Sequence, residues 1–188
     1  MVFVMGLALA ACSTTPKQVA LPTPPPDPHT LMPALETRIA VLIEEERERI
    51  NAKARPLVID PELSGIARKR SADMAAKNYL AHTAPDGETS ASILMDTDAR
   101  FQGLLGENMG AQHYTKQLGV DVNKFARAVV DQWLASPQHR DNLSFADYNL
   151  TGVGAAVNGD TVYVTELFAT DLGLGPHIDK TAPKPPGS

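Results

Sequence analysis

Two β-prone runs flank an Asn-Gly pair near the end of the chain, and this pattern constrains the fold more than any other feature. The runs cover residues 153–157 and 161–168, and Asn158-Gly159 lies between them. Asn-Gly favours the positive φ angles that a two-residue turn between antiparallel strands requires. We therefore expect the regular structure to end in an antiparallel hairpin.

Three helical patterns precede this hairpin. The first extends to about residue 54. The second follows Asp60-Pro61-Glu62, which supplies an N-cap and a proline suited to the first turn, and it should end near Ala81. Its inner stripe contains Leu63, Ile66, Ala67, Arg70 and Met74. The third pattern has apolar residues at i, i+3, i+4, i+7, i+8 and i+11 and stops before Pro137. Those residues are Val122, Phe125, Ala126, Val129, Val130 and Trp133.

The stretch between residues 82 and 106 is predicted to be mostly loop, with a turn at Pro85-Asp86-Gly87 and one short helix over residues 90–95. Helices that precede a late hairpin favour the α+β class, with the helices packed over a small antiparallel sheet.

An apolar run over residues 1–11 ends at the only cysteine of the chain, Cys12. The run cannot span a bilayer, which needs about 20 apolar residues. Leu9-Ala10-Ala11-Cys12 resembles the lipobox of bacterial lipoproteins, which implies a signal peptide over 1–11, cleavage before Cys12 and lipidation of its thiol. No Lys or Arg precedes the run, so we expect the true start to lie upstream. The alternative is a buried N-terminal element with an ordinary cysteine.

Proline-rich sequence follows over residues 12–33, and a second proline-rich stretch covers residues 173–188. We expect the first to be an extended tether, the second to be a disordered tail, and residues 34–172 to form one domain. Ser13 after the cysteine resembles the pattern of outer-membrane sorting. The resulting prediction is a cell-envelope lipoprotein that faces the periplasm or the exterior.

The net charge of -5 disfavours nucleic acid as a partner. A single cysteine rules out an intrachain disulfide, so the core must stabilise the domain without one. We expect a monomer, because no long exposed apolar edge is evident.

Polar residues that could carry chemistry lie at the predicted ends of elements: His82, Gly106-Glu107-Asn108, and the series from Ser136 to Asn142. Each also has an ordinary explanation. His82 could bind the last carbonyls of the second helix, Glu107 could be a turn residue, and Ser136-Pro137 could begin a short helix.

The order of these residues resembles that of the CAP superfamily, which includes cysteine-rich secretory proteins, insect antigen 5 and plant pathogenesis-related proteins. The resemblance covers about residues 43–168. It rests on Arg49-Ile50-Asn51, on the segment from Leu57 to Leu63, on His82, on Gly106-Glu107-Asn108, on the segment from Trp133 to Asn142, on Gly152-Val153-Gly154 and on the strand from Tyr163 to Phe168. It implies an α-β-α sandwich with a central antiparallel sheet and a cleft on one side.

In the family, two histidines and two acids gather in the cleft and sometimes hold a divalent cation. His82, Glu107 and His139 match three of them, and Ser136 stands where eukaryotic members have a glutamate. Two imidazoles and one carboxylate with a water are a known Zn²⁺ ligand set, so Zn²⁺ is a candidate cofactor. Ca²⁺, which prefers six or more oxygens, is less plausible. Glu166 alternates in phase with apolar residues, so its carboxylate needs a partner: it could be a substitute acid in the cleft or pair with an arginine or a helix-end amide.

Three functions are compatible with these residues. The first is a non-enzymatic module that binds a lipid, a glycan or a partner protein of the cell envelope. The second is a hydrolase of peptide or envelope polymer that uses His82, Glu107 and His139, with or without Zn²⁺, and a variant of it uses Ser136 as nucleophile. In the third, the polar residues form a structural network and binding occurs elsewhere.

Overall fold

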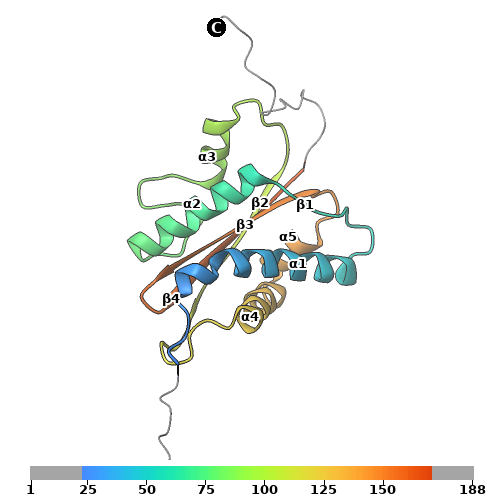
Figure 1. Cartoon of the computed structure of the whole chain (residues 1–188). Helices are drawn as coiled ribbons and strands as arrows, with labels where there is room; N and C mark the ends of the chain where they lie inside the picture. The colour runs from blue at the N-terminus through green and yellow to red at the C-terminus, as the bar shows by residue number, and fades with distance from the viewer. Residues whose placement is uncertain (1–22, 171–188) are drawn as a thin grey trace, which may run out of the picture.

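The computed structural model describes residues 23–170 (Figure 1). The predicted signal peptide, Cys12 and the tail over 173–188 lie outside the described residues. The elements in chain order are η1 Pro28–Leu31, α1 Met32–Ile50, β1 Val58–Ile59, α2 Pro61–Lys77, α3 Ser90–Thr97, β2 Leu105–His113, α4 Val122–Ala135, α5 Pro137–Ser144, β3 Leu150–Asn158 and β4 Thr161–Ala169.

The four strands form one sheet in the order β1-β3-β4-β2. The predicted hairpin is confirmed, since β3 and β4 pair antiparallel from Leu150–Ala169 to Asn158–Thr161, although the loop is Gly159-Asp160 rather than Asn158-Gly159. β2 pairs antiparallel with the other side of β4, and the two-residue β1 pairs parallel with the start of β3. The sheet is therefore mixed, not wholly antiparallel as expected.

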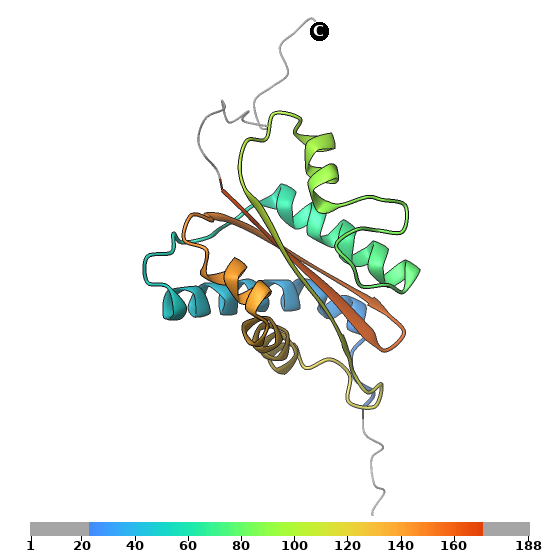
Figure 2. The same ribbon diagram turned by 180° about the vertical axis from the view of Figure 1, so that it is seen from behind.

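Helices cover both faces of the sheet. Figures 1 and 2 show α2 and α3 on one side and α1, α4 and α5 on the other. Every residue of β4 is buried, because this central strand has a helical layer on each face. The α+β class and the α-β-α sandwich are confirmed.

Local signals account for where α2 begins and ends. The Asp60 side chain accepts a hydrogen bond from the Leu63 amide, which satisfies a free N–H of the first turn. Asn78 then adopts a left-handed φ of 54° and ends the helix at Lys77, earlier than the predicted Ala81. His82 consequently lies in a loop beyond the helix.

The predicted bounds of two irregular segments differ from the structure. The segment over 82–106 is mostly loop with one short helix, as expected, but its last two residues belong to β2, which pairs with β4 over nine residues. The last residues of the predicted tether are helical, since η1 begins at Pro28 and α1 at Met32. Among the described residues, no helix combines the length and the apolar character needed to cross a membrane.

Candidate functional site

Glu107 and His82 are brought together at the edge strand β2. Glu107 lies opposite Leu167 of β4, which belongs to the apolar cluster beneath α2 and α3, so its side chain faces that layer. One carboxylate oxygen lies 2.7 Å from the His82 Nδ1, and the other accepts a 2.5 Å hydrogen bond from the hydroxyl of Ser90 at the start of α3. His82 and Glu107 were expected to lie close together, and their side chains are in contact.

This contact determines which His82 nitrogen is open. With the carboxylate as acceptor of this contact, Nδ1 is the donor, and a neutral ring then has its lone pair on Nε2. The His82 side chain is 62% exposed, whereas that of Glu107 is 12% exposed. The pair therefore presents an oriented imidazole to solvent, with a carboxylate behind it.

A buried arginine of α2, Arg70, lies beneath the same pair. Its Nη2 donates to the carbonyls of Ala81 at 2.9 Å and His82 at 3.1 Å, and its Nη1 donates to the Tyr79 hydroxyl at 3.1 Å. Its Nε lies 4.0 Å from a carboxylate oxygen of Glu107. Arg70 belongs to the predicted inner stripe of the helix, where no role was expected for it.

His139 approaches from the opposite helical layer, on α5. Its carbonyl accepts a hydrogen bond from the Asn108 side chain, and Asn142 donates both to the Glu107 carbonyl and to the Asn108 side chain. The His139 Nδ1 is buried and has no hydrogen-bond partner among the described residues. Burial lowers the pKa of His139, and repulsion from His82 lowers it further. The His82 imidazole therefore lies close enough to His139 to disfavour the protonated form of His139.

Gly106 lets α5 and the loop after it approach this strand. A Cβ at Gly106 would lie 2.5 Å from the Tyr148 hydroxyl and 3.1 Å from the Asn142 Oδ1. The interpretation of Glu107 as a turn residue was wrong, because Gly106-Glu107-Asn108 is strand throughout.

Ser136 is the N-cap residue of α5 by position, as the Ser-Pro pair predicts, but its side chain accepts no capping hydrogen bond. Within residues 23–170, the Ser136 hydroxyl makes no hydrogen bond to either His82 or His139. A nucleophilic Ser136 therefore lacks the adjacent base that such a residue needs.

Glu166 is a core residue, which corrects the expectation that it could be a substitute acid in the cleft. Its side chain is fully buried on β4, on the face that packs against α1 and α4. One oxygen accepts a 3.1 Å hydrogen bond from Thr151, and the other has no partner among the described residues. Burial raises the pKa of Glu166 well above its ordinary value, against the opposing effects of Thr151 and the buried Arg47.

The predicted Zn²⁺ ligands are not gathered as a metal site. Within residues 23–170, no three His, Cys, Asp or Glu side chains lie together in a way that could hold a metal ion. Both oxygens of Glu107 are already engaged by His82 and Ser90, so this carboxylate orients an imidazole rather than adding a ligand. A catalytic Zn²⁺ site needs three protein ligands, and the residues as arranged do not fit it.

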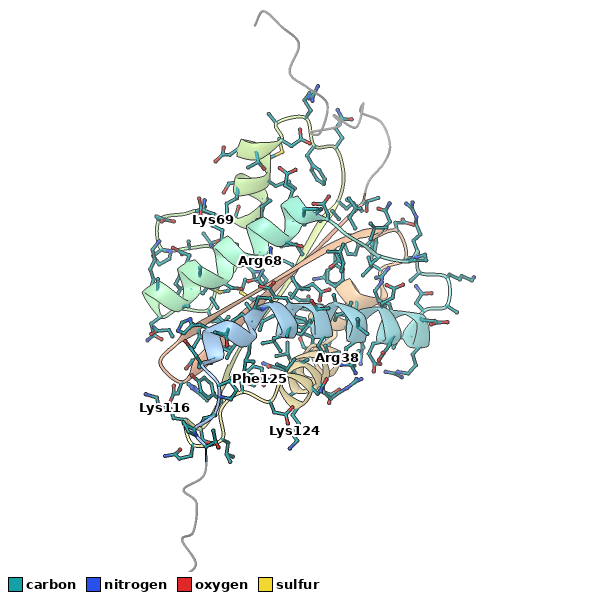
Figure 3. All side chains as sticks on the ribbon, in the orientation of Figure 1. Arg38, Arg68, Lys69, Lys116, Lys124 and Phe125 are labelled. Carbon is teal, nitrogen blue, oxygen red and sulfur yellow. The ribbon has the colours of Figure 1, made fainter. Side chains whose placement is uncertain are left out.

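A separate groove, the α1–α2 groove, runs between these helices beside the free edge of β3. Its volume is about 600 Å³. Figure 3 shows Arg68 of α2 between the two helices, where it forms a 2.7 Å ion pair with Glu36 of α1. The lining is mostly apolar, and it comprises His29, Met32, Pro33, Glu36, Arg68, Ala72, Ala75, Ala76 and residues 155–158. None of the predicted site residues lines this groove.

Comparisons with known proteins agree with this architecture. An uncharacterized protein of Bacillus subtilis (strain 168), YkwD, is 29% identical over 126 residues, which are 67% of this chain and 44% of YkwD. The chain thus spans less than half the length of that relative. An outer surface protein of Borrelia burgdorferi superposes with a TM-score of 0.60 at 22% identity, over 73% of this chain and 92% of the other.

An extracellular protein from Bacillus anthracis str. Ames that contains an SCP domain also has a TM-score of 0.60, at 26% identity, over 81% of this chain and 45% of the other. The sequence model of the cysteine-rich secretory protein family, CAP, matches residues 45–170, which is more than half of the chain. The chain therefore belongs to the CAP family, as the order of its motifs predicts.

Proposed function

We propose that this CAP domain is a non-enzymatic binding module of the cell envelope, and that its ligand contacts the polar site of His82, Glu107 and His139, which the family resemblance places in a cleft. The observation that carries the proposal is the exposed His82 imidazole, which the largely buried Glu107 carboxylate holds through its Nδ1. The exposed ring and the surrounding carboxylate and amide groups offer hydrogen bonds rather than an apolar surface. That chemistry suits a glycan or a polar segment of a partner protein better than an acyl chain.

The position of the tether supports this proposal. The described chain begins next to the loop before α4, where a Cβ on Gly119 would lie 2.6 Å from Pro25 (Figure 1). Glu107 is near the other end of β2, about 20 Å away at the usual rise of a strand. A tether from Cys12 would therefore join the domain at the end opposite the His82–Glu107 pair.

The α1–α2 groove favours a second ligand class. A largely apolar groove of about 600 Å³ lies in the range of small-molecule sites. Its alanines and Met32 could cover an acyl chain while Arg68 or His29 meets a polar head. A lipid is therefore the second candidate ligand, at a site distinct from the cleft.

Hydrolysis remains the alternative for the cleft itself. The Glu107 carboxylate orients His82 as a general base would require, with Nε2 open to a water or a hydroxyl group. Within the described chain, no positioned nucleophile contacts this imidazole, and the residues as arranged do not fit a Zn²⁺ ion.

Different histidines lie at the two sites, so their NMR signals can show which site binds a ligand. We expect peptidoglycan disaccharide-peptides, titrated into the protein, to shift the side-chain NMR signals of His82 and His139 and not those of His113 at the far end of β2. A lysophospholipid below its micellar concentration should instead shift His29, which lines the α1–α2 groove. Glu107→Gln should weaken the cleft response about tenfold, since a charged acceptor is lost, while Glu88→Gln on the nearby loop should not.

Each outcome bears on the proposal. If neither His82 nor His139 responds to the glycan fragments or to a panel of envelope proteins, the cleft is a structural network and the proposal fails. A shift of His29 alone would assign binding to the groove. Stoichiometric Zn²⁺ binding that perturbs both cleft histidines would show that the metal assembles ligands which the structure holds apart.

We also propose that Cys12 anchors the protein to a membrane outside the cytoplasm, and that Ser13 directs it to the outer membrane. In a Gram-negative host, the wild-type protein should partition into the detergent phase of a phase-separation assay and Cys12→Ser into the aqueous phase, because the two or three acyl chains are lost. Equal partition of the two proteins would sink the anchor while leaving the cleft proposal intact.

A further inference from the structure

One guanidinium contacts both partners of the His82–Glu107 pair. Arg70 is fully buried, and its side chain emerges from α2 directly beneath the loop that carries His82. Through Nη2 it holds the carbonyls of Ala81 and His82, and through Nε it lies 4.0 Å from Glu107. The loop and the carboxylate come from segments 25 residues apart, and Arg70 is common to both.

The chemistry of a buried cation explains this arrangement. A buried charge is tolerated when an opposite charge and hydrogen-bond acceptors surround it. Glu107 is the acid within 4.0 Å of Arg70 in the described chain, and three oxygens accept from its two Nη atoms. The Tyr79 hydroxyl, one of these acceptors, donates its own hydrogen bond to Asp73 at 2.6 Å, so a lone pair of its oxygen is left for the guanidinium.

We infer that Arg70 is a positioning residue, which fixes the direction and the tautomer of His82 by holding its main chain and by lying beside the Glu107 carboxylate that faces the ring. The inference rests on the proposed function only in that His82 is the group presented to the ligand. It deepens that proposal by naming what pre-organises the cleft. Arg70 itself is buried and is not expected to touch a ligand.

Helix α2 offers a matched control. Arg68 lies two residues before Arg70, points to the other side and pairs with Glu36. Arg68→Met removes an ion pair from the same helix, and Arg68 contacts neither His82 nor Glu107. A change that appears in Arg70→Met and not in Arg68→Met therefore arises from the cleft.

The test is the ¹⁵N spectrum of the histidine rings in the full chain without ligand, at a pH where His82 is neutral. The chemical shifts of Nδ1 and Nε2 report which nitrogen carries the proton. We expect His82 to be the Nδ1–H tautomer in the wild-type protein and in Arg68→Met. In Arg70→Met, the ratio of tautomers should shift by about tenfold toward Nε2–H, because the Ala81 and His82 carbonyls lose their common donor and the ring is no longer held against Glu107.

Arg70→Lys keeps the positive charge, but a single ammonium group cannot replace both guanidinium nitrogens that bind Tyr79 and the two carbonyls. This variant should therefore give an intermediate ratio of tautomers. If Arg70→Met fails to fold, Arg70→Lys decides the matter. A wild-type tautomer ratio in the folded Arg70 variants would overturn the inference and leave Arg70 as a packing residue. The measurement contains no ligand, so failure of the proposed binding function would not change its result.

Discussion

Replacement of Gly154 by alanine is expected to destabilise the domain by about 3 kcal/mol or more, enough to unfold much of it. The reason is contact between backbones. A Cβ at Gly154 of β3 would lie 2.1 Å from the Arg68 amide nitrogen and 2.2 Å from the Ala67 carbonyl carbon. Both are main-chain atoms of α2, so no side-chain rotation can relieve the overlap, and the helix would have to move off the sheet.

Urea denaturation followed by circular dichroism measures this effect, and α2 provides the control. Gly65 faces solvent, and a Cβ there would have nothing within 4 Å. Gly65→Ala should therefore stabilise the domain by about 0.5–1 kcal/mol through helix propensity alone. A Gly154→Ala midpoint equal to that of the wild-type protein would mean that α2 and β3 do not approach as closely as described.

The elements that the sequence predicts correctly are those with local signals. α4 has five of its six periodic apolar residues buried, and Trp133 also donates from its indole to the Met109 carbonyl at 3.0 Å. The Asp60 cap and the turn after Asn158 are equally local, since each depends on a few adjacent residues.

β2 could not be predicted in the same way. Its sequence, Leu-Gly-Glu-Asn-Met-Gly-Ala-Gln-His, has two glycines and no β-branched residue. Low β propensity is overridden here by nine-residue pairing with β4, a contact between segments far apart in the chain. Glu107 belongs to this strand, and for the same reason its sequence neighbours suggested a turn where the structure has a strand.

The residues of the candidate site also differ in how far the sequence predicts them. Family resemblance selects His82, Glu107 and His139, and the structure brings His82 into contact with Glu107. Arg70 and Ser90 are missed because their roles depend on which loop packs above them. A usable signal exists for Arg70: a charged residue in phase with the buried stripe of an amphipathic helix must find partners in the core. The same reasoning did single out Glu166, whose place in the core then follows from the strand face it shares with Val164 and Phe168.

Because of Glu166, the free energy of unfolding is expected to depend strongly on pH. Burial raises its pKa well above the ordinary 4.5, so the folded protein retains a proton that the unfolded chain releases. Stability is then fully present below the unfolded pKa and is lost as pH rises toward the folded pKa, with a slope approaching about 1.4 kcal/mol per pH unit. Glu166→Gln, which is neutral at every pH, should remove this loss, so the variant gains stability relative to the wild-type protein as pH rises from 4.5.

Free energies of unfolding in urea, measured from pH 4.5 to pH 8 for both proteins, give the comparison. The difference between them is informative because surface acids such as Glu46 and Asp73, whose pKa values are lowered by their cationic partners, act with the opposite sign in both proteins. Glu48→Gln on the exposed side of α1 should leave the wild-type profile unchanged. If the difference between Glu166→Gln and the wild-type protein is constant with pH, Glu166 is ionised in the folded protein. The positive charge of Arg47 would then outweigh the cost of burial, and the core would contain an ion pair instead of a neutral acid.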